Sequence, residues 1–230
     1  MNEQEQTPQE NETDSSPALH KVELPLSIRA AREALDWFSN AVWAVAFVIL
    51  LLTFVVRVAQ VDGSSMYKTL HGTDRVYIGA TEEERKLAHV DSLFVSNLFY
   101  TPKQGDIVVF QSPDSSVGEP IIKRVIATAG QTVRIDYNTS TVTVDGKVPE
   151  KESCAYFSGG SMKAYLQGWG LDENGIFEYT VPEGYLFVMG DNRNNSKDSR
   201  STDIGPLDER FVFGHVLIRF LPFSEFGKVN

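Results

Sequence analysis

The longest hydrophobic segment of the chain is an uncharged run of 20 residues from Trp37 to Val56. At about 1.5 Å rise per residue, a helix of this length crosses a hydrocarbon core of about 30 Å. A cleaved signal peptide has a shorter apolar core of about 7–15 residues, which fits this run poorly. The pattern therefore predicts one transmembrane helix that anchors the chain. Helical spacing also occurs around Ile28 to Trp37 and Thr81 to His89.

After this run, the chain changes to short stretches rich in Val, Ile, Phe and Tyr, bounded by Gly, Pro, Asp and Asn. Such stretches are typical of β-strands. Turn signals at Val144-Asp145-Gly146-Lys147 and Pro182-Glu183-Gly184 support this interpretation. The predicted fold class is mainly β and mostly antiparallel, preceded by a single N-terminal transmembrane helix. The predicted strands are Arg75–Ile78, Asp106–Phe110, Ile121–Ala127, Thr132–Ile135, Thr141–Val144, Tyr185–Met189 and Phe211–Phe220.

Composition suggests three parts: a tail over residues 1–36, the anchor over 37–56 and a β-rich domain over 57–230. The tail begins with Met1 to Leu19, which has almost no apolar residues and is predicted to be disordered. Within the domain, residues 151–180 are glycine-rich and predicted to form an irregular insert or small subdomain.

Charge and cysteine content exclude several classes of function. The net charge is −10, divided equally between the tail (3 basic and 8 acidic residues) and the part after the anchor (18 basic and 23 acidic). No basic block indicates nucleic acid binding. Cys154 is the only cysteine, which excludes an internal disulfide and a multi-cysteine metal cluster. No zinc-ligand spacing such as H-E-x-x-H occurs, so the sequence predicts no metal site.

A candidate nucleophile, Ser65, follows the apolar run by nine residues, within Gly63-Ser64-Ser65-Met66. The segment fails the G-x-S-x-G pattern, which argues against an α/β-hydrolase. By itself it also fits a serine-rich turn. A serine hydroxyl needs a base to become a nucleophile. The histidines occupy no recognisable motif; they are His20, His71, His89 and His215.

Lys123 is the candidate base, because a buried lysine loses its charge more easily than one in water. It lies in the predicted strand Ile121–Ala127, where apolar residues flank it on both faces. This pattern favours a strand buried on both sides. The alternative is an edge strand whose Lys123 and Arg124 reach water.

A third segment, from Gly190 to Arg200, has no apolar side chain. Its Asn, Asp, Ser and Arg side chains can bond to one another and to the backbone, and so hold a fixed loop shape. A calcium loop is a rival interpretation, but Arg193 and Lys197 would oppose a cation there.

These segments together resemble the type I signal peptidases, which are membrane-anchored serine proteases. The resemblance extends from the apolar run to about Leu221 and rests on four motifs in the family's order. Two positions depart from the family pattern: Lys68 replaces a proline, and Thr128-Ala129-Gly130-Gln131 replaces Leu-Pro-Gly-Asp. The matching motifs are Ser65-Met66-Tyr67-Lys68-Thr69-Leu70, Gly105-Asp106-Ile107-Val108-Val109-Phe110, Lys123-Arg124-Val125 and Gly190-Asp191-Asn192-Arg193 through Ser196-x-Asp198-Ser199-Arg200.

The resemblance implies a role for each matched position. Ser65 would be the nucleophile, with its backbone N–H in the oxyanion hole, and Lys123 the general base. Ser196 would orient the lysine amine, while Asp198 and Arg200 would pair to brace the loop. The residues implied to contact substrate are Asp62, Gly63, Met66, Ile121 and Ile122.

The resemblance also implies a fold of two antiparallel sheets and a place in the bacterial cell membrane. The N-terminus would be cytoplasmic and the catalytic domain extracytoplasmic, a topology that the charges flanking the run leave open. The expected partners are the lipid bilayer and signal peptides with small residues one and three positions before the cut, without cofactor, metal or nucleic acid. Two alternatives stay open: a self-cleaving Ser/Lys protease, and a membrane-tethered binding module that has lost activity.

Overall fold

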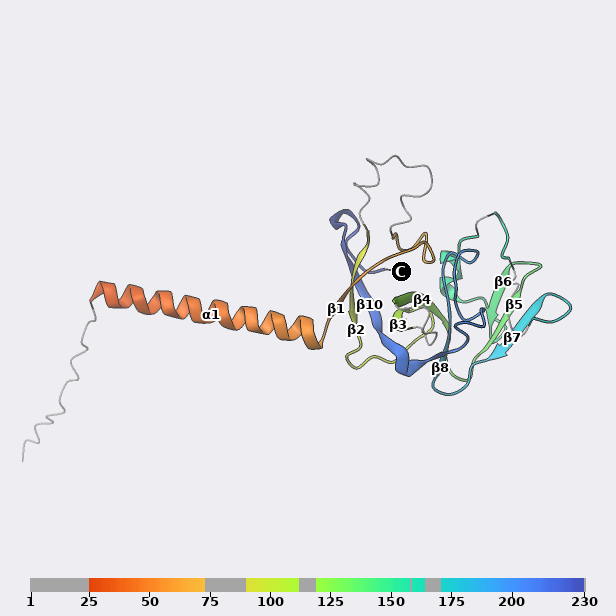
Figure 1. Cartoon of the computed structure of the whole chain (residues 1–230), viewed down its shortest axis with the longest axis horizontal. Helices are drawn as coiled ribbons and strands as arrows, with labels where there is room; N and C mark the ends of the chain where they lie inside the picture. The colour runs from red at the N-terminus through yellow and green to blue at the C-terminus, as the bar shows by residue number, and fades with distance from the viewer. Residues whose placement is uncertain (1–24, 73–89, 112–118, 158, 164–170, 230) are drawn as a thin grey trace, which may run out of the picture. The chain divides into compact units, whose positions relative to one another are not determined.

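The computed structural model describes residues 25–72, 90–111, 119–157, 159–163 and 171–229 (Figure 1). Three predictions lie outside these ranges: the disordered start Met1–Leu19, the strand Arg75–Ile78 and the helix Thr81–His89. The chain divides into two compact units, residues 1–47 and 48–230.

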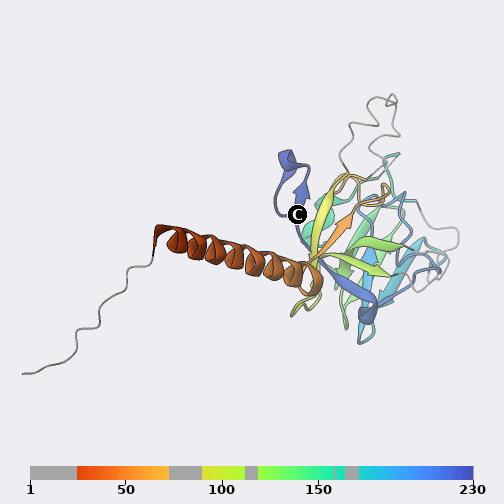
Figure 2. The same ribbon diagram turned by 60° about the vertical axis from the view of Figure 1, so that its left-hand side comes forward.

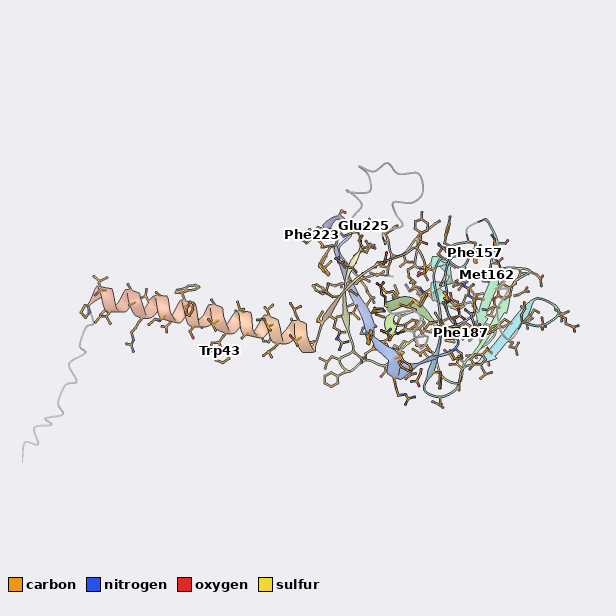
Figure 3. All side chains as sticks on the ribbon, in the orientation of Figure 1. Trp43, Phe157, Met162, Phe187, Phe223 and Glu225 are labelled. Atoms are coloured by element: carbon orange, nitrogen blue, oxygen red, sulfur yellow. The ribbon has the colours of Figure 1, made fainter. Side chains whose placement is uncertain are left out.

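The N-terminal apolar run forms one helix, α1, over Leu26–Phe54. It includes the predicted Ile28–Trp37 helix and ends two residues before Val56. In the described part of the chain, α1 is the only helix long and apolar enough to cross a bilayer. None of its apolar window is buried within the protein, and Trp43 projects from it with 73% of its surface exposed (Figure 3). Its apolar surface is therefore available to lipid.

The larger sheet carries most of the β-rich unit and is antiparallel throughout. Its strand order is β1-β2-β10-β3-β4-β8-β9 (Figure 1). β4 lies inside the sheet, between β3 and β8, and its last five residues, Lys123 to Ala127, are buried. In chain order the strands are β1 Arg57–Gln60, β2 Ser92–Ser96, β3 Ile107–Gln111, β4 Pro120–Ala127, β8 Tyr185–Met189, β9 Leu207–Asp208 and β10 Val212–Leu221.

The smaller sheet has the order β6-β5-β7. It contains β5 Thr132–Asp136, β6 Thr141–Val144 and β7 Ile176–Thr180. The expected fold, mainly β with two antiparallel sheets, is confirmed. The predicted turn after β6 is also present, because Val144 and Lys147 exchange both backbone hydrogen bonds, at 2.8 and 3.0 Å.

The prediction of an irregular segment over residues 151–180 is wrong at its end. β7 pairs with β5 along its whole length, and its Phe177 is 2% exposed in the core. The 3₁₀ helix η2, Glu150–Cys154, lies near the start of the same segment. Two further 3₁₀ helices flank β10: η3 Glu209–Phe211 and η4 Phe223–Glu225.

Buried apolar residues form three clusters that hold the two sheets and the loops together. The first cluster joins the smaller sheet to β4 and β8, and Figure 3 labels its members Phe187 and Met162 together with Phe157, which packs against it. The third cluster contains Met66 and Leu70 with residues of β2 and β3. A second view shows the same sheets turned by 60° (Figure 2). The third cluster fixes the segment next to Ser65 on the larger sheet.

Candidate active site

Ser65 lies in a turn anchored by buried apolar side chains. Met66 and Leu70 are 1% and 0% exposed. The turn closes with Thr69 and Leu70 N–H groups, which both donate to Met66 O at 2.9 Å. Ser65 itself is only half-buried. Anchored neighbours therefore hold a hydroxyl that remains accessible.

Lys123 lies directly opposite this serine, on β4. Its amine Nζ is 2.8 Å from Ser65 Oγ and donates to Ile122 O at 2.9 Å. The side chain is buried, as are all later residues of β4, which confirms the prediction of a strand buried on both sides. The contact joins the two residues that the sequence analysis selected as nucleophile and base.

Burial lowers the pKa of the Lys123 amine from 10.5 to about 8. The Asp198 carboxylate opposes this shift, and the Arg200 guanidinium adds to it. A neutral amine has a lone pair that can accept the Ser65 hydroxyl proton while one N–H donates to Ile122 O. This arrangement can activate a serine without a histidine.

The loop from Gly190 to Arg200 packs behind this pair, with Asp198 at its centre. Asp198 is 0% exposed and pairs with Arg200, whose Nε and Nη2 both donate at 2.8 Å. Burial alone would raise the pKa of the Asp198 carboxyl, but Arg200 and hydrogen bonds from Gly190 and Ser196 lower it. Asp198 is therefore an ionised brace, and the pair expected between Asp198 and Arg200 is present.

Ser196 donates its hydroxyl to Asp198 Oδ2 at 2.7 Å. Its Oγ also lies beside Gly190, where an added Cβ would come within 2.2 Å of it and within 2.5 Å of Ser65 O. Among the described residues, the Lys123 amine forms hydrogen bonds with Ser65 and Ile122. Ser196 Oγ thus lies close to the Ser65 turn, and its hydroxyl bonds to the buried carboxylate. Its implied role in orienting the lysine amine stays a prediction.

Two further residues of the same loop hold the Ser65 turn, and sequence reasoning missed both. Asn192 donates its backbone N–H to Ser65 O at 3.0 Å and its side-chain amide to Ser64 O at 3.1 Å. Asp191 accepts two bonds from Arg124 at 2.8 and 2.7 Å, and one from Thr69. Both residues lie in the matched motif that begins at Gly190, and this position was the sequence signal that could have identified them.

An open groove of about 1060 Å³ has Ser65 and Lys123 in its lining. One wall follows β1 and the residues after it, and the other follows the start of β4. All five residues expected to contact substrate line it: Asp62, Gly63, Met66, Ile121 and Ile122. The groove therefore brings the residues expected to contact substrate into the same lining as the Ser65 hydroxyl.

The described residues that could together hold a metal ion are His71, Asp91 and Glu225. Arg219 already donates to Asp91 and to Glu225, at 2.9 Å each. Its guanidinium supplies the positive charge at this cluster. His215 lies outside this cluster. Its ring stacks on the Tyr100 ring, and its Nδ1 is 3.0 Å from Ser96 O.

Ser65 and the buried Lys123 amine meet in the lining of this groove, an arrangement that suits a serine endopeptidase with a lysine base. The family described as "Signal peptidase, peptidase S26" matches residues 34–221. The chain belongs to this family.

Individual relatives agree with this assignment. The chain is 33% identical over 193 residues to the probable signal peptidase I-1 of Synechocystis sp., covering 81% of this chain and 82% of the relative. It is 33% identical over 197 residues to signal peptidase I T of Bacillus subtilis, covering 85% and 90%. A crystal structure of a signal peptidase I from Enterococcus faecalis matches at 30% identity and a TM-score of 0.36, covering 50% of this chain and 97% of that one.

Proposed function

We propose that this protein cleaves N-terminal signal peptides from exported preproteins, with Ser65 as nucleophile and Lys123 as general base. The observation that carries the proposal is the 2.8 Å contact between Lys123 Nζ and Ser65 Oγ in the lining of the groove. Membership of the signal peptidase family supports the choice of substrate.

The proposed reaction begins when the neutral Lys123 amine takes the Ser65 proton. Ser65 Oγ then attacks the scissile carbonyl, and the Ser65 N–H stabilises the oxyanion, a kind of contact worth about 10²–10³ in rate in a studied protease. The lysine ammonium returns its proton to the leaving amine, which releases the mature protein. Lys123 next takes a proton from water, and the resulting hydroxide attacks the acyl-serine ester. As the ester bond breaks, the lysine ammonium returns this proton to Ser65 Oγ, which frees the signal peptide and restores the neutral amine.

The substrate would lie in the groove as an added strand. Backbone groups of Asp62-Gly63 on one side and Ile121-Ile122 on the other would bind it, and alternate side chains would face the groove walls. The apolar lining, which includes Met66, favours small apolar residues one and three positions before the cut, as in Ala-x-Ala.

We propose that α1 anchors the protein in the bacterial cell membrane with the N-terminus cytoplasmic and the β-rich unit outside. The exposed apolar surface of α1 supports a membrane position. Ser65 follows the end of α1 by eleven residues, so only a short stretch of chain separates the proposed anchor from the proposed nucleophile.

The test is an assay of the purified full-length protein in detergent or vesicles with a preprotein that carries an Ala-x-Ala site. Mass spectrometry of the product should show one cut directly after the second alanine. Ser65→Ala should abolish the cut, whereas Ser64→Ala keeps the dyad and should retain it. An intact preprotein with the wild-type enzyme would favour the alternative of a binding module, and equal cleavage by Ser65→Ala would remove Ser65 from the mechanism.

A further inference from the structure

Lys68 follows Ser65 by three positions and carries a positive charge. The proposed reaction does not use this charge. The lysine side chain is exposed, and Nζ lies 5.0 Å from the ring centroid of Tyr156. Among the described residues, no carboxylate forms an ion pair with it. The charge is therefore available to a bound molecule.

Aromatic packing gives this lysine a defined position. The Tyr67 ring meets the Tyr156 ring edge to face at 5.1 Å and the His71 ring at 5.7 Å. Tyr156 is itself held by the loop behind the dyad, because its N–H donates to Asp191 O at 2.7 Å and its carbonyl accepts from Arg193 N at 2.9 Å. A cation over a fixed ring is restrained by the ring's quadrupole.

The position of Lys68 relative to the groove indicates which part of a substrate it meets. The groove is lined by β1, the start of β4 and the residues up to Met66, and it includes neither Tyr67, Lys68 nor Tyr156. Tyr67 and Lys68 follow Ser65 directly in the chain but lie outside the groove lining, so a substrate that continues beyond the serine would pass the turn that carries Lys68. Each extended residue advances about 3.3 Å, so the first three residues after the cut would lie within about 10 Å of Ser65, in the neighbourhood of this lysine.

We propose that Lys68 makes this enzyme prefer preproteins with acidic residues in the first three positions of the mature chain. The proposal rests on the signal peptidase function proposed above. A carboxylate about 5 Å from the ammonium gains an attraction in water that corresponds to about a threefold to fourfold rate advantage, and a lysine or arginine suffers a similar loss. The expected preference for acidic over basic substrates is therefore about tenfold at low salt, and weaker at high salt.

The experiment measures kcat/KM for three preproteins that share one signal peptide and Ala-x-Ala site. Their second and third mature residues are both Asp, both Asn or both Lys. The full-length wild type is compared with Lys68→Met, Lys68→Arg and Lys68→Glu at 0.05 and 0.5 M salt. Lys147→Met is the matched control, because Lys147 is an exposed lysine in the turn after β6 of the smaller sheet.

For the wild type, Lys68→Arg and Lys147→Met, we expect kcat/KM to be highest for the Asp preprotein, intermediate for the Asn preprotein and lowest for the Lys preprotein. Lys68→Met should cut all three preproteins about equally, and Lys68→Glu should reverse the order. Equal rates for the wild type, or a preference that survives in Lys68→Met, would overturn the inference while leaving the proposed function intact. Failure of the wild type to cut the Asn preprotein would instead overturn the proposed function, and the inference with it.

Discussion

Lys123 Nζ lies 2.8 Å from Ser65 Oγ although 58 positions separate the two residues in the chain. The lysine is carried by an interior strand of the larger sheet, and the serine by a turn bound to the loop behind it. Because each partner is held by a different rigid element, small changes in either element should alter catalysis without unfolding the domain.

The first prediction concerns the cost of burying Lys123. The pKa of its amine is about 8 in the folded protein and about 10.4 in an unfolded chain, so the unfolded state binds more protons between these values. The free energy of unfolding should therefore rise with pH from 8 to 10.4. Lys123→Met removes the burial penalty and should stabilise the protein below pH 8, by up to about 3 kcal/mol, while abolishing cleavage.

Denaturant unfolding at pH 7 and at pH 10.5 measures this effect. Lys147→Met, at an exposed lysine, is the control and should change stability little at either pH. The stabilisation by Lys123→Met should largely vanish at pH 10.5. A mutant that is equally stabilised at both values, or destabilised at pH 7, would contradict the account of a buried amine that is costly to charge.

The second prediction concerns the buried Asp198–Arg200 pair. Asp198→Asn leaves the Arg200 guanidinium buried without its charge partner and should destabilise the protein by about 3–5 kcal/mol. Asp208 and Arg210 have the same spacing and a similar pairing, but Arg210 is 86% exposed, so Asp208→Asn should leave the unfolding midpoint nearly unchanged. Thermal unfolding of both variants checks this contrast, which would fail if the two midpoints fell equally.

The third prediction concerns the close approach at Gly190. A methyl group there would lie 2.2 Å from Ser196 Oγ and 2.5 Å from Ser65 O, so Gly190→Ala must displace the Ser65 turn. We expect kcat/KM to fall more than tenfold and stability to fall by about 1–3 kcal/mol. Preprotein cleavage and thermal unfolding, measured on the same samples, check both effects.

Gly184→Ala serves as the control for this substitution. Gly184 has φ +77 and open space around it, so alanine there strains the backbone without reaching the dyad. It should lose stability but retain cleavage. Full cleavage by Gly190→Ala would show that the contact between the loop and the Ser65 turn is unimportant.

The sequence was sufficient to predict those elements whose pattern is local. Apolar residues on both faces of Ile121–Ala127 indicated a buried strand, and β4 is one. β1 was missed because Arg57–Gln60 is short and directly follows the apolar run. β7 was missed because glycines surround it, although Phe177 is a core residue.

The contacts within the site were harder to predict from the sequence, because they join residues that are far apart in the chain. Lys123 and Ser65 meet only because β4 and the turn after β1 form the two sides of one groove, and no spacing along the chain encodes that. Arg124, which follows Lys123 in the chain, likewise bonds to Asp191, and the two residues are 67 positions apart. The resemblance to a family identified the candidate site residues, and the structure showed which of them are in contact.

The pH dependence of cleavage tests the central claim most directly, because that claim is that a neutral Lys123 activates Ser65. With kcat/KM measured for one Ala-x-Ala preprotein from pH 6 to pH 10, the rate should rise about tenfold per pH unit below 8. It should then level off, with one apparent pKa of about 8. A profile without this rise, or one whose apparent pKa lies near 6.5 or 10.4, would contradict the account.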